Sequence, residues 1–125
     1  MVKTALVELE INEGRKLLEL FGAHAVPFEA AFWRISEDPG SSRLVLVTSL
    51  IDEIGERKTL RRLLDIPTES PDRTKVELED LTIVSPKSRF GKAIRRKFRS
   101  LHDQYFEGLR IGDERIADAY LYFAR

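Results

Sequence analysis

The segment VPFEAAFWRISEDPGSSRLVLVTSL, residues 26–50, contains two apolar runs joined by a turn sequence. The first run, residues 26–36, is rich in aromatic and β-branched residues, which favours a strand. The second run, residues 43–50, is almost continuously apolar, and Asp38-Pro39-Gly40 between the two runs is typical of a turn. These features predict an antiparallel β-hairpin. Because residues 44–47 show no polar alternation, we expect the second strand to be central in its sheet and buried on both faces.

Before this hairpin, the spacing of apolar residues predicts a helix from about Thr4 to Phe21. Gly22 is then expected to end the helix. Gly14 costs about 1 kcal/mol of helix propensity, so its place on the apolar stripe predicts close packing against another element. The alternation in residues 3–11 leaves a strand open as a second interpretation, with a shorter helix beginning at Asn12. The stripe of the single helix consists of Val7, Ile11, Gly14, Leu18 and Phe21.

After the hairpin, the chain alternates helical and extended patterns. A helix is expected from Glu56 to Asp65, with Pro67 ending it. Leu81–Val84 is typical of a short strand. Ser85 is expected to cap a further helix that has Pro86 at its first position and continues to about Ser100.

The last part of the chain predicts a closing hairpin, with strands at residues 105–111 and 116–124 around a turn at 112–115. The order α-ββ-α-β-α-ββ therefore predicts an α+β fold, a single domain over residues 1–125 with a mixed five-stranded sheet and three helices. If strands 43–50 and 81–84 are parallel, the segment that joins them would be a right-handed crossover. In the final strand, one face is expected to carry Ala117, Ala119, Leu121 and Phe123, and the other Asp118, Tyr120 and Tyr122.

Composition excludes several kinds of chemistry. The 125 residues include no cysteine, which excludes disulfides, thiolate metal sites and a cysteine nucleophile. With only two histidines, a three-histidine metal site cannot form within one chain. We found no dinucleotide-binding, Walker-type or nucleophile-elbow motif, so we expect no cofactor and no metal. The uncharged stretches are too short to cross a membrane, and residues 3–10 do not resemble a signal peptide, which predicts a cytoplasmic protein.

Two short segments resemble a known group of proteins. Residues 31–33 are Ala-Phe-Trp, and residues 43–55 are Arg-Leu-Val-Leu-Val-Thr-Ser-Leu-Ile-Asp-Glu-Ile-Gly. Together they resemble a group of small, uncharacterised bacterial soluble proteins with no assigned activity. In that group proline is frequent at or beside the position of Ser49, and this chain has none there. The resemblance covers the first half of the chain and implies a hairpin followed by a helix, with no particular reaction.

The most unusual local feature is a run of positive charge between Lys87 and Arg99. This stretch contains seven basic residues and no acidic one, whereas the rest of the chain has 14 basic and 21 acidic residues. At 100° per residue, five of the cations fall on one helix face. Such a face is suited to the phosphates of a nucleic acid or to another polyanion, such as an acidic protein. These five residues are Arg89, Lys92, Arg95, Arg96 and Arg99.

The helix predicted at residues 56–65 is also basic. If it covers the same side of the sheet as the helix beyond Ser85, the two outer faces would merge into one positive surface. The simpler interpretation of both helices is a solvated surface balanced by acidic residues elsewhere. The cations of this helix are Arg57, Lys58, Arg61 and Arg62.

A second candidate site follows the central strand. Asp52 and Glu53 come directly after it. If the strand that ends at Val84 is its parallel neighbour, Ser85 and Lys87 would lie near them at the same edge of the sheet. Two carboxylates with a lysine suit a small metal-dependent phosphodiesterase, a nuclease-like enzyme. The competing interpretation is a turn and the acidic first turn of a helix, which we favour.

Weaker candidates are more simply structural. Glu56 and Lys58, with Asp38 upstream, match a nuclease pattern that requires a strand, whereas a helix is expected there. His24 and His102 have no adjacent nucleophile and are expected at the surface. The aromatic residues of the first hairpin are expected in the core, and Asp72 with Glu77 lacks the lysine of the nuclease pattern.

The sequence therefore favours a small binding module that contacts a polyanion, with the phosphodiesterase as the alternative. Tyr120 and Tyr122 on the final strand, together with an unpaired hairpin edge, also predict self-association into a homo-oligomer.

Overall fold

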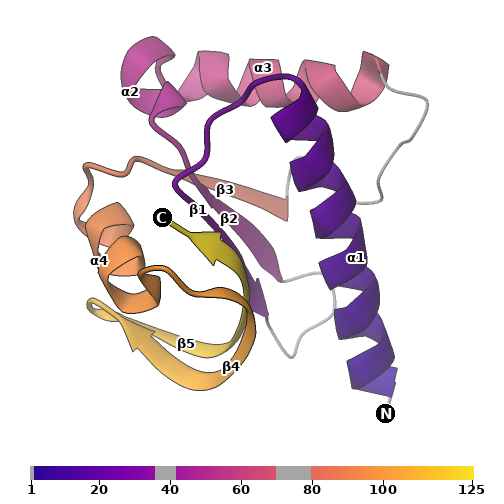
Figure 1. The fold of residues 1–125 in the computed structure, drawn as a ribbon, viewed down its shortest axis with the longest axis vertical. Helices are drawn as coiled ribbons and strands as arrows, with labels where there is room; N and C mark the ends of the chain where they lie inside the picture. Colours follow the sequence, from indigo (N-terminus) through magenta and orange to yellow (C-terminus); the bar gives the residue numbers. More distant parts are fainter. Residues whose placement is uncertain (1, 36–41, 70–79) are drawn as a thin grey trace.

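A computed structural model of the chain describes residues 2–35, 42–69 and 80–125. It is an α+β fold with a mixed five-stranded sheet, and the described residues form four helices rather than the three expected. Figure 1 shows α1 and α4 on different sides of the molecule, with α2 and α3 together across one end of it. The turn Asp38-Pro39-Gly40 and the pair Asp72 and Glu77 lie outside the described residues. Within residues 2–35, 42–69 and 80–125, no helix is both long enough and apolar enough to cross a membrane.

The sheet has the strand order β3-β2-β1-β5-β4. Its strands are β1 (Ala30–Ile35), β2 (Arg43–Val47), β3 (Leu81–Val84), β4 (His102–Ile111) and β5 (Glu114–Ala124). β2 is antiparallel to β1, as the sequence predicted, and parallel to β3, which the sequence had left open. β5 is inserted between β1 and β4, so strands far apart in the chain are direct neighbours. The C-terminal hairpin is thus part of the main sheet.

The buried central strands explain the continuous apolar run in the sequence. Leu44, Leu46 and Val47 are 0% exposed and Val45 is 2% exposed, which confirms the predicted burial. Alternate residues point to two hydrophobic cores on opposite faces of the sheet. The first core contains Leu44 and Leu46, and the second contains Val45 and Val47.

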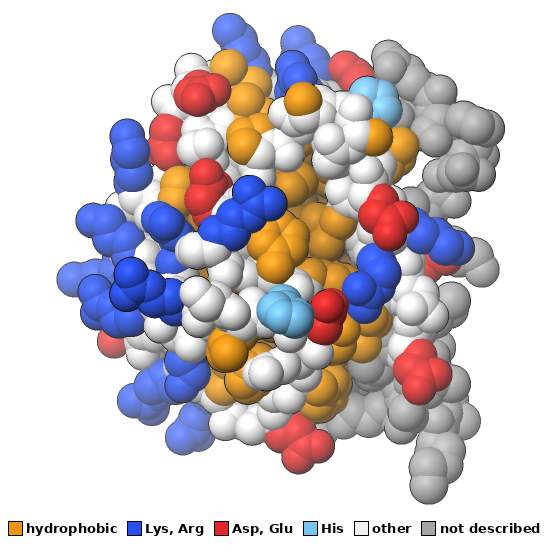
Figure 2. Space-filling view, viewed as in Figure 1, with side chains coloured by type: hydrophobic (Ala, Val, Ile, Leu, Met, Phe, Trp, Pro, Cys, Tyr) orange, Lys and Arg blue, Asp and Glu red, His pale blue; other side chains and the backbone are white. Residues whose placement is uncertain are grey.

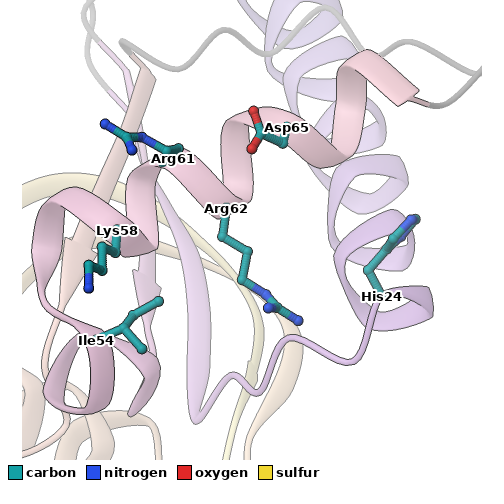
Figure 3. Close-up of a pocket in the computed structure, with 6 residues that line it drawn as sticks. All are labelled: His24, Ile54, Lys58, Arg61, Arg62 and Asp65. Atoms are coloured by element: carbon teal, nitrogen blue, oxygen red, sulfur yellow. The ribbon is translucent and has the colours of Figure 1, made fainter.

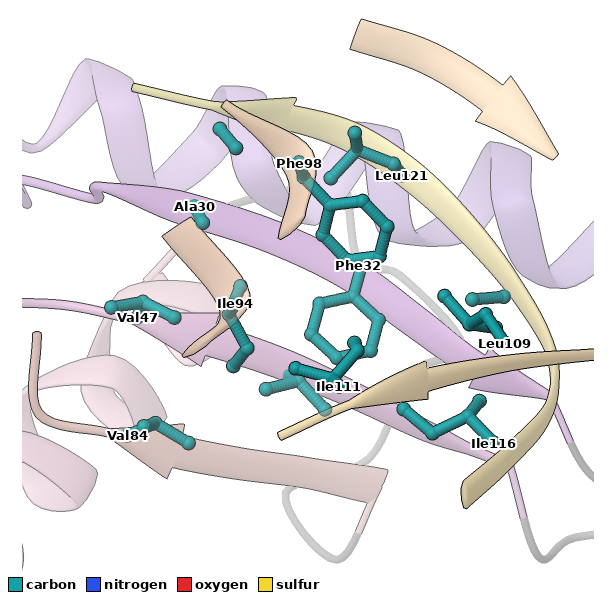
Figure 4. Packing of buried hydrophobic residues seen from close by; sticks show 13 residues of the cluster. Ala30, Phe32, Val47, Val84, Ile94, Phe98, Leu109, Ile111, Ile116 and Leu121 are labelled. Carbon is teal, nitrogen blue, oxygen red and sulfur yellow. The ribbon is translucent and has the colours of Figure 1, made fainter. Parts of the chain in front are cut away.

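Helices cover both faces. The first core is closed by α1 (Val2–Ala23), α2 (Leu50–Ile54) and α3 (Glu56–Glu69), and the second by α4 (Arg89–Phe98). Figure 4 shows Ile94 and Phe98 of α4 packed among strand side chains of the second core. The aromatic residues Phe28, Phe32 and Trp33 are buried, as expected.

The long α1 confirms the single-helix interpretation of residues 3–11 and excludes the strand. Gly14 packs against Trp33 and Tyr122, which confirms the predicted close approach. Gly22 does not end the helix, however. The amide of Val26 donates to Phe21 O at 3.1 Å and that of Ala25 donates to Gly22 O at 3.0 Å, with Ala25 at φ 59°. This is a Schellman ending in which Ala25 takes the left-handed position that glycine usually occupies.

Three further helix boundaries differ from those predicted. α3 continues to Glu69, so Pro67 does not end it. α4 begins after Ser88, not Ser85, since the Ser88 hydroxyl accepts from the Gly91 amide at 3.0 Å. α4 ends at Phe98, so Arg99 is its C-cap and lies outside the helix.

The face assignment of the final strand was correct in part. The register between β1 and β5 shifts between Ala31 and Phe32, which leaves Tyr122 as an extra residue in β5. A bulge of this kind turns successive side chains to the same side. Tyr122 and Phe123 therefore both pack on the first core, whereas Leu121 and Ala119 are in the second.

Candidate functional site

The cations of α4 lie on its outer side. Gly91, Ile94 and Phe98 are its buried residues. The exposed residues of α4 are all basic. Those on one side of the helix form, with the C-cap residue Arg99, what we call the cationic face, whereas Lys97 is exposed beside it. The cationic face comprises Arg89, Lys92, Arg95, Arg96 and Arg99, every one of them exposed.

Close packing holds this helix against the sheet. The Phe98 ring lies 5.6 Å from that of Phe32 and 5.1 Å from that of Phe106, both measured between ring centroids. A Cβ on Gly91 would clash with the backbone oxygen of Ser85, so the first turn of α4 contacts the preceding turn directly. The cationic face therefore projects from a well-anchored backbone.

Few acceptors neutralise the cationic face. Arg89 has Asp113 at 4.0 Å, with both side chains more than 90% exposed, and a pair so exposed is weak. Arg95 donates to the backbone oxygen of Arg125 at 3.4 Å. Within residues 2–35, 42–69 and 80–125, no carboxylate forms an ion pair with Lys92, Arg96 or Arg99. Figure 2 shows Lys and Arg side chains gathered on the side of the molecule where α4 lies.

The basic residues of α3 do not extend this surface. Leu63 of α3 belongs to the first core, whereas Ile94 and Phe98 of α4 belong to the second. The two helices thus cover opposite faces of the sheet, and the merged positive surface considered from the sequence does not form. Lys58, Arg61 and Arg62 instead line a separate cavity, shown in Figure 3, and Arg57 is exposed on the same helix.

The second candidate site forms only in part. The Ser85 hydroxyl lies 2.7 Å and 3.0 Å from the two carboxylate oxygens of Asp52, so the parallel strands do bring these residues together. The amide of Lys87 donates to the Ser85 hydroxyl at 3.1 Å. Asp52, Glu53 and Lys87 are all exposed, and none of them lines the cavity beside α3.

The hydrogen bond between Ser85 and Asp52 is explained by the start of a helix and does not require a catalytic role. Asp52 and Glu53 form the first turn of α2, the position at which acidic side chains are commonly found in helices. No group of three possible metal ligands occurs within the described ranges. Glu56 and Lys58 also lie on a helix, α3, so the nuclease pattern with Asp38 lacks its strand geometry.

Comparison with known proteins gives no identity. We found no protein-family model, no curated protein and no solved structure that matches the chain. The resemblance of residues 31–33 and 43–55 to uncharacterised bacterial proteins therefore stays a prediction. Function has to be argued from the surfaces of the molecule.

One polar network was not expected from the sequence. Arg15 of α1 donates to Asp103 at 3.2 Å and to the Tyr120 hydroxyl at 3.1 Å, and His102 lies 3.5 Å from Asp103. Burial acts to raise the pKa of Asp103, but Arg15 and His102 outweigh it and lower the pKa below its ordinary value. The two partners of each hydrogen bond are 88 and 105 positions apart in the chain, so no short sequence motif could have predicted the network. Because the network joins α1 to the last hairpin, we assign it a structural role.

Proposed function

We propose that the protein is a small binding module that contacts the phosphate backbone of nucleic acid through the cationic face of α4. The observation that supports it most strongly is the set of exposed cations on one anchored helix, four of them without a carboxylate side chain as partner in the described ranges. The net charge of the chain is zero, so this attraction comes from the distribution of charge.

The dimensions of α4 suit such a contact. A helix of 10 residues is about 15 Å long, which spans several phosphates of a duplex. If three to five side chains neutralise phosphates, log K should fall with log salt at a slope of roughly −2 to −4.5. Contacts to phosphates carry little sequence information, so we expect slight sequence preference.

Fluorescence anisotropy with labelled single- and double-stranded DNA and RNA at low salt tests the proposal. We expect micromolar binding by the wild type and its loss in the double variant Lys92→Glu/Arg96→Glu, because both side chains point away from the core. The matched control is Arg57→Glu/Arg61→Glu, an exposed i,i+4 pair on α3, which makes the same change in net charge on the other face of the sheet. Circular dichroism should show that both variants stay folded.

Three outcomes decide the matter. Loss of binding in the α4 variant alone supports the proposal. Equal loss in both variants overturns it, because the attraction would then be a property of the whole surface. Binding to poly-glutamate but not to nucleic acid, with the same dependence on Lys92 and Arg96, overturns it in favour of an acidic protein partner.

The phosphodiesterase alternative has less support. Its carboxylate Asp52 is hydrogen-bonded to Ser85, and Lys87 forms no ion pair with Asp52 or Glu53 among the described residues. A cytoplasmic location and a homo-oligomer were predicted from the sequence, and the binding-module proposal requires neither of them.

A further inference from the structure

A cavity of about 350 Å³ lies beside α3, on the opposite side of the sheet from the cationic face of α4. Its wall is contributed by the end of α1, the last residue of α2 and one side of α3 (Figure 3). Ligand cavities begin at about 300 Å³, so this one is large enough for a small organic molecule. The lining residues are His24, Ile54, Lys58, Arg61, Arg62 and Asp65.

The lining is strongly basic. Lys58 and Arg62 are one turn apart and project from the same side of α3, Lys58 toward Ile54 and Arg62 toward the end of α1 (Figure 3). Arg61 adds a third cation, and Asp65 is the one carboxylate of the lining. The excess of two positive charges equals the charge of a phosphate monoester above its second pKa.

His24 is oriented by its own helix. Its Nδ1 lies 3.0 Å from the backbone oxygen of Leu20, which can only accept, so Nδ1 carries the hydrogen. Nε2 is then an acceptor in the neutral imidazole, which suits an N–H or O–H donor of a ligand and not the phosphate itself. The Schellman ending fixes the position of this residue, because Val26 just beyond it is buried in the first core.

One wall of the cavity is apolar. Ile54 at the end of α2 is 37% exposed, which is unusual for a large hydrophobic side chain in this structure. A charged group held by Lys58 and Arg62 would place an attached organic body near Ile54, since Lys58 lies next to it in Figure 3.

We propose that this cavity binds a small phosphate monoester. The side chains of Lys58 and Arg62 point apart in Figure 3, and both would turn toward the phosphate, with Ile54 against the organic part. The site is independent of the cationic face, because the two are on opposite sides of the sheet. The phosphate could belong to a free metabolite or to the 5′ end of a nucleic acid strand, and both present the same dianionic group.

Titration of the ¹⁵N-labelled chain with phenyl phosphate, followed by amide NMR shifts at pH about 8, tests the site. Shifts are expected at His24, Ile54 and the first two turns of α3, with tighter binding than for inorganic phosphate. Lys58→Gln and Arg62→Gln should each weaken binding about tenfold, as expected for loss of one charge-assisted hydrogen bond. The matched control, Arg57→Gln on the same helix but outside the cavity, should change affinity less than twofold.

A 5′-phosphorylated tetranucleotide and its unphosphorylated form show whether the phosphate belongs to a nucleic acid end or to a free metabolite. If the amide shifts at His24, Ile54 and α3 show tighter binding of the phosphorylated tetranucleotide than of both its unphosphorylated form and phenyl phosphate, the site is assigned to nucleic acid ends. Tighter binding of phenyl phosphate at these residues assigns it to a metabolite. No shifts at millimolar phenyl phosphate, or equal weakening by Arg57→Gln, would overturn the proposal. The variant Lys92→Glu/Arg96→Glu should bind phenyl phosphate normally, so failure of this site and failure of the proposed function are distinguishable.

Discussion

Tyr122 links three elements through one hydroxyl group. It donates to the backbone oxygen of Ile11 at 2.5 Å and accepts from Trp33 Nε1 at 2.8 Å, which joins α1 to the two adjacent strands β1 and β5. Trp33 and Tyr122 are 2% and 5% exposed, so water does not replace these hydrogen bonds easily. Gly14 allows the contact, because α1 passes directly over the two rings.

Gly14→Ala is therefore expected to destabilise the fold. A Cβ at this position would lie 2.6 Å from Trp33 Nε1 and closer still to the Tyr122 hydroxyl, so the rings or the helix must move. We expect a loss of about 1–3 kcal/mol in the free energy of unfolding, typical of overpacking. Gly22→Ala, in the same helix with nothing near its Cβ, should instead gain up to about 1 kcal/mol. Urea unfolding measures both, and a neutral Gly14→Ala variant would contradict the packing.

Tyr122→Phe should alter the alkaline stability of the protein. Burial is the main cause that raises the pKa of Tyr122 above its ordinary value of 10.0, and the Trp33 hydrogen bond opposes it in part. Above about pH 10 the folded state thus keeps a proton on Tyr122 that the unfolded chain releases. The contribution of Tyr122 to the free energy of unfolding is therefore fully present below about pH 10 and is lost as the pH rises above it.

At neutral pH the variant should lose about 1–3 kcal/mol, because the Trp33 N–H is left without its acceptor. Between about pH 9 and 11 its stability should fall less steeply than that of the wild type. Urea unfolding across this range measures the difference, and parallel curves would show that Tyr122 does not titrate with unfolding. The raised pKa of Tyr105 is present in both proteins and does not affect the comparison.

At the scale of single elements, the two serine N-caps provide a matched pair. Ser88 accepts from the Gly91 amide at 3.0 Å and donates to Ser85 O at 2.6 Å, whereas Ser49 at the start of α2 makes no side-chain cap. Ser88→Ala should therefore cost about 1 kcal/mol of stability and Ser49→Ala close to nothing. Thermal unfolding tests this, and equal effects would contradict the assigned start of α4.

The elements that the sequence predicted well are those with strong apolar patterns. Leu44–Val47 had to be covered on both sides, and the stripe through Gly14 had to face another element. The errors lie at helix ends and in the last strand, where local signals compete. Ser85 and Ser88 both resemble an N-cap, and only the tertiary contact of Gly91 with Ser85 selects the second. The bulge at Tyr122 depends on pairing with β1, about 90 residues away, which no short pattern reveals.

For the candidate sites, the sequence identified basic residues but not their arrangement. The spacing of Lys92 and Arg96 was sufficient to place them on the outer side of α4. Whether Arg61 and Arg62 joined them depended on which sheet face α3 covers, and this is set by Leu63 packing in the first core. The cavity at His24 also could not be foreseen, because its walls come from the ends of α1 and α2.

At the scale of the whole molecule, two of the features from which self-association was predicted are not available at the surface. β5 has a neighbouring strand on each side, so it has no free edge for a second copy of the chain. The Tyr122 side chain is buried and cannot contact a second copy either. The outer edge of β4 contains Asp103 at φ 48° and Gly108 at φ 57°, conformations that interrupt an edge ladder. We expect light scattering at low micromolar concentration to give the 14.4 kDa monomer mass. A dimer mass would instead support the homo-oligomer predicted from the sequence.

The insertion of β5 between β1 and β4 also has a consequence for synthesis on the ribosome. β1 can pair with β2 early, but its other edge has no partner until residues 114–124 have emerged. At the usual rate of about 5–20 residues per second, synthesis from the end of β2 to the end of β5 takes about 4–15 s, far longer than a hairpin needs to form. During that interval Phe32 and Trp33 lie in a strand with an open edge, the kind of surface through which nascent chains aggregate. The nascent chain is therefore most dependent on chaperone protection between the completion of β2 and the release of β5.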